Sequence, residues 1–157
     1  MMNNMNIKIS IANEVHLNEI VDITMDSIIG EKYFVNKNIN EIIHKGIKNN
    51  EIYIADENSK VSGFLWYTKD GCFGKYPYLH MLIVGKQYRN RKYGTKLLNY
   101  FEEELFSASD KLFLMVADFN TKAKSLYERL GYIEVGRLPK FYTKEVDEIL
   151  MMKDKLT

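Results

Sequence analysis

The chain has 157 residues, 27% of them charged, and a formal net charge of +1 at pH 7. This length fits one domain, predicted to cover residues 1–157 and long enough to bury most of its apolar surface. A nearly neutral chain provides no global field toward nucleic acid or anionic lipid, so we expect neither as a partner. The only cysteine, Cys72, excludes an intramolecular disulfide and a cysteine metal cluster, and we predict no metal site.

The hydropathy of the chain predicts its location. The first ten residues, MMNNMNIKIS, lack the continuous apolar run of a signal peptide. No apolar stretch approaches the length that spans a bilayer. We therefore expect a reduced, cytoplasmic protein that does not contact a membrane.

The first half of the chain combines strand and helix periodicities. Alternating isoleucines predict a strand over Asn6–Ala12, and apolar residues at helical spacing predict a helix over Val15–Ile29 with Gly30 as its stop. A second amphipathic helix is predicted over Ile39–Lys48. Two strands are then predicted over Glu51–Asp56 and Lys60–Lys69. A turn at Glu57-Asn58-Ser59 joins them, and a reversal at Asp70-Gly71 follows the second.

The second half predicts two strand–helix pairs followed by two strands. The first helix begins near Tyr93 or Gly94, and Gly131 suits the end of the second because the residue there takes left-handed dihedrals. The order β-α-α-β-β-β-α-β-α-β-β favours an α/β fold with a mixed sheet and helices on both faces. The predicted segments are the strand Tyr78–Val84, the helix that presents Leu97, Leu98, Phe101 and Leu105 inward, the strand Lys111–Ala117, the helix Thr121–Leu130, and the strands Tyr132–Arg137 and Val146–Asp154.

A basic turn separates the strand Tyr78–Val84 from the helix that follows it. Backbone N–H groups at a helix start are unpaired, and the helix dipole makes that end positive, which suits a bound pyrophosphate. A solvated basic turn that caps a helix is the alternative interpretation. The basic residues around the turn are Lys86, Arg89, Arg91, Lys92 and Lys96.

A second motif begins at the end of the strand Lys111–Ala117. Asn120 is an acceptable helix N-cap, and Tyr127 follows it by seven residues, or two helical turns, so their side chains share one helix face. Ala123 lies between them, and Gly131-Tyr132 closes the segment. Taken alone, a tyrosine at such a position is more commonly a half-buried core residue than a catalytic one.

Through these two motifs, the chain resembles the GNAT superfamily of acetyl-CoA-dependent N-acetyltransferases. The basic turn is similar to the pyrophosphate loop Q/R-x-x-G-x-G/A, with Arg89 and Gly94 at the first and last positions. Lys92 replaces the middle glycine. One interpretation is that its β-carbon crowds the phosphate or forbids a positive φ; the other is that its ammonium adds a phosphate contact. The second motif is similar to V-x-x-x-N-x-x-A-x-x-x-Y-x-x-x-G-F/Y, and every marked position is filled.

The resemblance implies acetyl-CoA as acetyl donor, and a central twisted sheet that splays apart between the fourth and fifth strands. Pantetheine would enter this wedge and pair with the backbone of residues 82–84, and pyrophosphate would sit on the N–H groups of residues 91–95. The cofactor-binding residues implied in this way are Leu82, Ile83, Val84, Arg89, Asn90, Arg91, Lys92, Tyr93, Gly94, Thr95, Asn120, Ala123 and Tyr127.

The implied reaction is a direct attack, in a ternary complex, of a primary amine of a small molecule or peptide on the acetyl-CoA thioester. Tyr127 matches the superfamily's general acid, since a phenol remains protonated at neutral pH and can donate to the leaving sulfur. The N–H of Leu82 matches the group that polarises the carbonyl. No glutamate lies between Gly74 and Tyr100, so His80 is the candidate base on its strand face. The run Leu79-His80-x-Leu82-x-Val84 resembles arylalkylamine N-acetyltransferases; a histidine held by hydrogen bonds for structure is the alternative.

The acceptor stays open at this stage. The resemblance places acceptor recognition in the first two helices and the last hairpin, where ordinary surface and packing roles are the commoner interpretation of any single residue. The alternatives are a protein N-terminal or lysine acetyltransferase, an acyl-CoA-binding module without catalysis, and a nucleic-acid binder; the expected assembly is a monomer or homodimer. The candidate acceptor contacts are the acidic Asp22, Asp26 and Glu31 and the aromatic Tyr33, Phe34, Phe141 and Tyr142.

Overall fold

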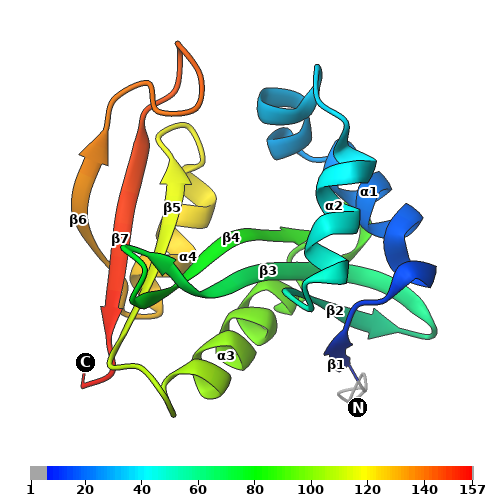
Figure 1. Ribbon diagram of the computed structural model, residues 1–157, viewed down its shortest axis with the longest axis horizontal. Helices are drawn as coiled ribbons and strands as arrows, with labels where there is room; N and C mark the ends of the chain where they lie inside the picture. The colour runs from blue at the N-terminus through cyan, green and yellow to red at the C-terminus, as the bar shows by residue number, and fades with distance from the viewer. Residues whose placement is uncertain (1–6, 157) are drawn as a thin grey trace. The chain divides into compact units, whose positions relative to one another are not determined.

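A computed structural model describes residues 7–156, and within them a seven-stranded sheet has the order β1-β2-β3-β4-β5-β7-β6 (Figure 1). Strands β4 and β5 are parallel, whereas β1 with β2, β2 with β3, β5 with β7 and β6 with β7 are antiparallel. This confirms the predicted α/β fold with a mixed sheet. The elements are β1 (Lys8–Ile11), α1 (Leu17–Met25), α2 (Ile39–Lys48), β2 (Ile52–Glu57), β3 (Lys60–Cys72), β4 (Tyr76–Val84), α3 (Tyr93–Leu105), β5 (Lys111–Ala117), α4 (Thr121–Arg129), β6 (Ile133–Leu138) and β7 (Glu148–Asp154).

The described chain forms two compact units. The first unit ends at Trp66 and resumes over Met81–Tyr100, and the second comprises Tyr67–His80 and the chain from Phe101 onward. Strands β3 and β4 and helix α3 contribute residues to both units. The single domain remains a prediction.

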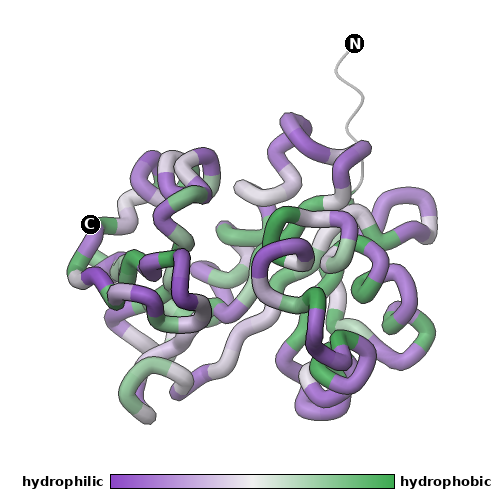
Figure 2. Tube along the Cα trace, turned by 90° about the horizontal axis from the view of Figure 1, so that it is seen from above, coloured by the Kyte–Doolittle hydropathy of each residue, from purple (hydrophilic) through white to green (hydrophobic). Residues whose placement is uncertain are grey.

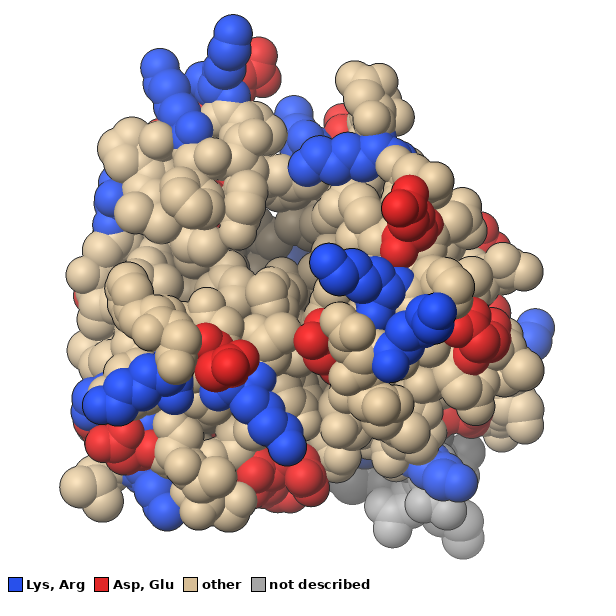
Figure 3. Space-filling model, in the orientation of Figure 1, with Lys and Arg blue, Asp and Glu red and all other residues tan. Residues whose placement is uncertain are grey.

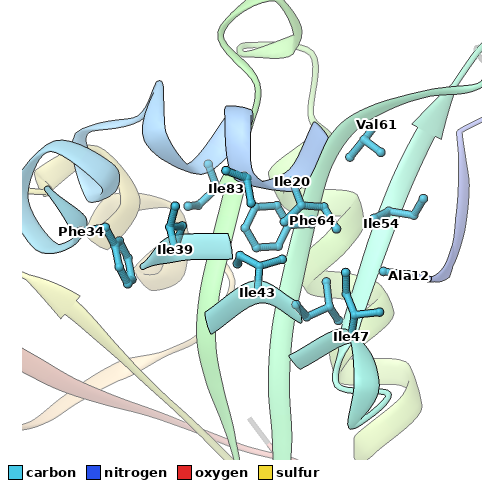
Figure 4. Close-up of a cluster of buried hydrophobic side chains, with 12 residues drawn as sticks. Ala12, Ile20, Phe34, Ile39, Ile43, Ile47, Ile54, Val61, Phe64 and Ile83 are labelled. Atoms are coloured by element: carbon cyan, nitrogen blue, oxygen red, sulfur yellow. The ribbon is translucent and has the colours of Figure 1, made fainter. Parts of the chain in front are cut away.

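The first unit packs helices α1 and α2 on the strands β2, β3 and β4. Ile20 of α1 and Ile43 of α2 are fully buried and face Phe64 of β3 (Figure 4). Hydrophobic and hydrophilic residues alternate along the helical turns of this unit, as amphipathic helices require (Figure 2). The buried cluster consists of Ala12, Ile20, Val21, Phe34, Ile39, Ile43, Ile47, Ile52, Ile54, Val61, Phe64 and Ile83.

The second unit is built on β5, β7 and β6, with α4 against β5 (Figure 1). The parallel register of β4 with β5 joins Tyr78 to Phe113 and Leu79 to Leu114. Cys72, Tyr78 and Phe113 form a buried cluster, against which Tyr76, Met115, Leu150 and Met152 pack. The parallel pairing therefore fixes the register of β4 against β5.

Most predicted elements are confirmed, two of them without a change in their bounds. Helix α2 and strand β5 have the predicted limits, and the predicted inward residues of α3 are all buried. The turn after β2 is a two-residue hairpin in which Asn58 and Ser59 have φ of 53° and 63°, as a type I′ turn requires. Asn6, the predicted start of the first strand, lies outside the described residues.

The predicted end of the first helix is wrong. Helix α1 ends at Met25, and Gly30 begins a π-helical turn (Gly30–Phe34) where a stop was predicted. The Ser27 hydroxyl donates to the Thr24 carbonyl oxygen at 2.6 Å, and such side-chain bonds compete with the helical ladder. A Cβ at Gly30 would lie 2.2 Å from the Thr24 carbonyl oxygen, so this glycine allows a close approach of two backbone segments.

The predicted reversal at Asp70-Gly71 is also wrong, because β3 continues through both residues to Cys72. The chain reverses at Phe73 and Gly74, which have φ of 56° and 65°. A Cβ at Gly71 would lie 2.1 Å from Thr68 Oγ1, so this glycine makes room inside the strand.

Candidate active site

The basic turn after β4 has left-handed backbone at two residues that are not glycine. Asn90 and Lys92 have φ of 59° and 63°, in the left-handed region that favours glycine. Lys92 thus adopts the positive φ in the place of the motif's middle glycine, and the interpretation that a lysine there forbids it is wrong. The first bond of helix α3 runs from the Lys96 amide to the Lys92 carbonyl oxygen at 3.0 Å. The amides of residues 93–95 therefore precede the helical ladder, as an anion site requires.

Three of the basic side chains around this loop have separate partners. The Arg91 guanidinium lies 2.6 Å from Glu57 Oε1, and Lys86 Nζ lies 2.7 Å from Asp26 Oδ1. Arg89 Nε donates to the carbonyl oxygen of Val84 at 3.3 Å. Within residues 7–156, Lys92 and Lys96 form no ion pair. Among the basic residues around this loop, these two ammonium groups are thus the ones that no described carboxylate neutralises.

The predicted pantetheine strand, Leu82 to Val84, ends β4 directly before this loop. Leu82 and Val84 are half-buried, whereas Ile83 points into the core cluster of the first unit. A Cβ at Gly63 would lie 2.8 Å from the Ile83 carbonyl oxygen, so β3 approaches β4 closely here. Gly85 then donates its amide to the Ser62 carbonyl oxygen at 2.8 Å, which ties the strand end to β3.

Helix α4, in the second unit, positions Tyr127. Its N-cap, Asn120, accepts a hydrogen bond from the Ala123 amide at 3.3 Å, as the motif predicts. The Tyr127 side chain is buried, and burial raises the pKa of its phenol to about 12. In the part of the chain that the structure describes, this hydroxyl makes no hydrogen bond. It is a neutral donor with its bonding capacity unused.

His80 lies on β4 in the same unit and is exposed. Its Nε2 atom is 2.9 Å from Thr68 Oγ1 on β3, and its ring meets Tyr78 edge-on with centroids 4.7 Å apart. Sequence reasoning missed Thr68. The signal was available, because Thr68 and His80 are each six residues from Gly74 and therefore face each other across a hairpin that turns there.

A buried carboxylate adjoins this group and was also missed. Glu148, the first residue of β7, is buried. Tyr142 shares a hydrogen bond with Tyr78. Burial, then Tyr142, then the charge of Glu148 raise the pKa of the Tyr78 hydroxyl far above its ordinary range. A polar residue inside the strand pattern of β7 was the available signal. Together these contacts hold Tyr142, on the β6–β7 loop, to β4.

The candidate acceptor residues divide between surface and core. Phe34 is part of the buried core of the first unit, and Asp26 forms the ion pair with Lys86, so both have structural roles. Phe141 and Tyr142 are each 54% exposed and their rings lie 4.7 Å apart. Asp22 and Glu31 are exposed, and Tyr33 is half-buried. Of these candidates, Phe141 and Tyr142 form an exposed aromatic pair.

Charges of both signs lie interspersed on the face seen in Figure 3, in agreement with the net charge of +1. No helix in residues 7–156 has the length and hydropathy to cross a membrane. The site residues are thus distributed as follows: the loop and the end of β4 belong to the first unit, whereas His80, Tyr127 and Glu148 belong to the second.

Comparison with known proteins adds a family relationship. A model described as the acetyltransferase (GNAT) family matches residues 19–132. An uncharacterized N-acetyltransferase of Methanocaldococcus jannaschii is 32% identical over 108 residues, which are 68% of this chain and 67% of that protein. N-alpha-acetyltransferase 30 of Dictyostelium discoideum is 32% identical over 76 residues, 48% of this chain and 41% of that protein.

A solved structure supports the same relationship. The crystal structure of a GNAT-family acetyltransferase from Bacillus cereus superposes with a TM-score of 0.78 at 25% identity, over 96% of this chain and 99% of the other. The match therefore extends over nearly the whole fold, whereas the chain spans less than half the length of the Dictyostelium protein.

Proposed function

The chain belongs to the acetyltransferase (GNAT) family, and on that premise we propose that it transfers an acetyl group from acetyl-CoA to a primary amine by direct attack in a ternary complex. The observation that carries the proposal is the Tyr127 phenol, which is buried, neutral and without a hydrogen bond among the described residues. Such a group suits a donor to a developing thiolate. Acetyl-CoA supplies the activated acetyl group.

The donor site in this proposal uses the loop before α3. The amides of residues 93–95 precede the helical ladder, and the positive φ of Lys92 keeps the loop open to a diphosphate despite its side chain. Lys92 and Lys96 add positive charge that no carboxylate among residues 7–156 neutralises. Residues 82–84 would pair with pantetheine, and the Leu82 amide would polarise the thioester carbonyl.

His80 is the proposed base that takes the proton from the attacking amine, directly or through a water molecule. Its Nε2 atom contacts Thr68 Oγ1 at 2.9 Å, and its ring packs against the edge of Tyr78. These two contacts fix the ring orientation, which general base catalysis requires. The exposure of His80 keeps it accessible to an acceptor.

We propose a peptide α-amine as the acceptor class. The support is the relative named as an N-alpha-acetyltransferase, together with the exposed pair Phe141 and Tyr142, which offers apolar and hydroxyl contacts to an extended peptide. The hydrogen bond between Tyr78 and Tyr142 connects this pair with the strand that carries His80. A cytoplasmic location and a monomeric or dimeric state remain predictions.

The test is a thiol-release assay with acetyl-CoA and a panel of amines. It compares peptides that have a free N-terminus with the same peptides blocked at the N-terminus but carrying lysine, and with polyamines and arylalkylamines. The proposal expects release of free CoA thiol that depends on a free α-amine. Release with lysine side chains or small amines alone would overturn the acceptor class. Tight acetyl-CoA binding without release on any amine would instead support a module without catalysis.

A further inference from the structure

The Arg91 side chain in the loop before α3 is engaged within the first unit. Its Nη2 atom lies 2.6 Å from Glu57 Oε1, and the two side chains are 34% and 15% exposed. The guanidinium also lies over the rings of Tyr88 and Tyr93, 5.7 Å and 5.4 Å from their centroids. Arg91 is therefore held by one carboxylate and two aromatic faces.

Glu57 occupies a fixed position. It is the last residue of β2, it pairs with Lys60 of β3, and the tight turn at Asn58 and Ser59 follows it. The same carboxylate faces the hydroxyl of buried Tyr93, the first residue of α3, and after burial itself it is the next cause that raises the pKa of that phenol to about 12. One carboxylate on the sheet thus pairs with the loop at Arg91 and lies near the start of the helix, where the Tyr93 hydroxyl is buried without a hydrogen bond among the described residues.

The loop needs such support. Arg91 stands between Asn90 and Lys92, and both of these neighbours have left-handed dihedrals that residues with a β-carbon adopt at an energetic cost. In the related motif, glycine removes that cost at the middle position. Here the conformation must be held by contacts: the Arg89 side chain bonds to the end of β4, and the Arg91 side chain pairs with a carboxylate of β2.

We propose that Glu57 is a positioning residue for acetyl-CoA, which acts through Arg91 to hold the loop so that the amides of residues 93–95 face the diphosphate. The inference rests on the proposed function. It assigns the side chain of Arg91 to the protein scaffold, and only its backbone to the phosphate site.

The alternative is that Arg91 binds a phosphate directly. The two interpretations predict opposite signs for one substitution. If Arg91 is a phosphate ligand, Glu57 competes for it and adds unfavourable negative charge, so Glu57→Gln should strengthen acetyl-CoA binding. If Glu57 positions the loop, the same substitution should weaken binding.

The experiment measures acetyl-CoA affinity by calorimetry for the wild-type protein, Glu57→Gln, Arg91→Met and the double variant. We expect each single variant to raise Kd by about fivefold, with the double variant no weaker than either single one. With a reactive amine, kcat should stay within about twofold of wild type. Asp26→Asn, which removes the exposed Lys86 pair at the same loop, is the matched control and should leave Kd unchanged.

Hydrogen exchange without ligand provides the second measurement. The amides of residues 90–95 should exchange faster in Glu57→Gln and in Arg91→Met, and Glu57→Asp, which keeps the charge, should restore part of the protection. An unchanged or lower Kd in Glu57→Gln, with binding intact in the wild type, would overturn this inference alone. A wild-type protein that binds no acetyl-CoA would overturn the proposed function and this inference with it.

Discussion

The Tyr132 amide donates a hydrogen bond to the Tyr127 carbonyl oxygen at 3.0 Å, and the rings of the two residues lie 6.0 Å apart. With the bond from the Gly131 amide to the Glu128 carbonyl oxygen, this forms a Schellman motif that ends α4. Gly131 has φ of 92°, which only glycine adopts readily. The motif and the ring contact therefore fix the backbone and the side chain of the proposed general acid.

Replacing Tyr127 with Phe removes the proton donor and keeps the ring. We expect kcat to fall by about 10²-fold, because general acid catalysis contributes on that order, and the Kd of acetyl-CoA to stay within about twofold. Steady-state kinetics and calorimetry measure the two quantities. Tyr53→Phe, on β2 of the other unit, is the control that should retain activity. An unchanged kcat in Tyr127→Phe would remove this residue from the mechanism.

The raised pKa of Tyr127 also predicts how stability depends on pH. The folded state holds this pKa at about 12, whereas a tyrosine in the unfolded chain has a pKa near its ordinary 10.0. The unfolded state therefore loses its proton first, and the stability from this group is complete below pH 10 and is lost as pH rises toward 12. Urea denaturation at pH 8 and at pH 10.5 should show a smaller alkaline loss in Tyr127→Phe than in wild type. An equal loss would contradict the burial of the phenol.

The proposed base predicts a change in the pH profile. With His80 as the proposed base, kcat/KM should rise with pH in wild type, and His80→Gln should flatten that rise. Thr68→Val removes the contact to Nε2 and should lower kcat without flattening the profile, because the ring loses its orientation and keeps its base. His44→Gln, on α2, is the control. A wild-type profile in His80→Gln would instead indicate a water molecule or a group on the substrate.

The left-handed conformation of Lys92 predicts an unusual ranking of substitutions. Lys92→Gly should be more stable than Lys92→Ala by about 1 kcal/mol, because left-handed dihedrals are unfavourable for alanine, which has a β-carbon, and not for glycine. Both variants lose the ammonium group equally. The free energy of unfolding in urea measures the difference. Equal stability of the two variants would contradict the positive φ at this position.

A partly buried ion pair in the second unit predicts an effect on stability. Lys153 Nζ lies 2.7 Å from Glu102 Oε2, with side chains only 17% and 13% exposed. Lys153→Met should lower the free energy of unfolding by about 2 kcal/mol, between the values for exposed and for buried pairs, because it leaves a partly buried carboxylate without its partner. Lys153→Met with Glu102→Leu should recover most of the loss. If the double variant is less stable than the single one, the carboxylate is not what destabilises it.

Periodicity predicted the fold well where side-chain burial alone decides the structure. Helix α2 and strand β5 have simple apolar patterns, and their predicted bounds are correct. The prediction failed where side chains bond to the backbone, as Ser27 does at the end of α1, and where a glycine serves close approach, as Gly71 does in β3. Both failures depend on neighbours that the local pattern does not reveal.

The sequence predicted the motif residues of the candidate site but not the residues that contact them. The motifs indicated Tyr127, His80 and the loop before α3, and the structure adds partners that lie far away in the sequence. Glu57 is 34 residues from Arg91, and only the pairing of strands brings the two side chains together. In the sequence, Arg91 was one of several positive charges beside a predicted phosphate site. Its ion pair with Glu57 is the reason why we assign the Arg91 side chain to the scaffold of the loop.

The most direct test is a titration of ¹⁵N-labelled protein with acetyl-CoA, followed through the backbone amide resonances. The account predicts saturable shifts of residues 91–95 and of residues 82–84, with smaller changes elsewhere in the first unit. Pantetheine, which lacks the diphosphate, should shift the amide resonances of residues 82–84 and leave those of residues 91–95 unchanged. Acetyl-CoA that binds without moving the amides of residues 91–95 would contradict the account.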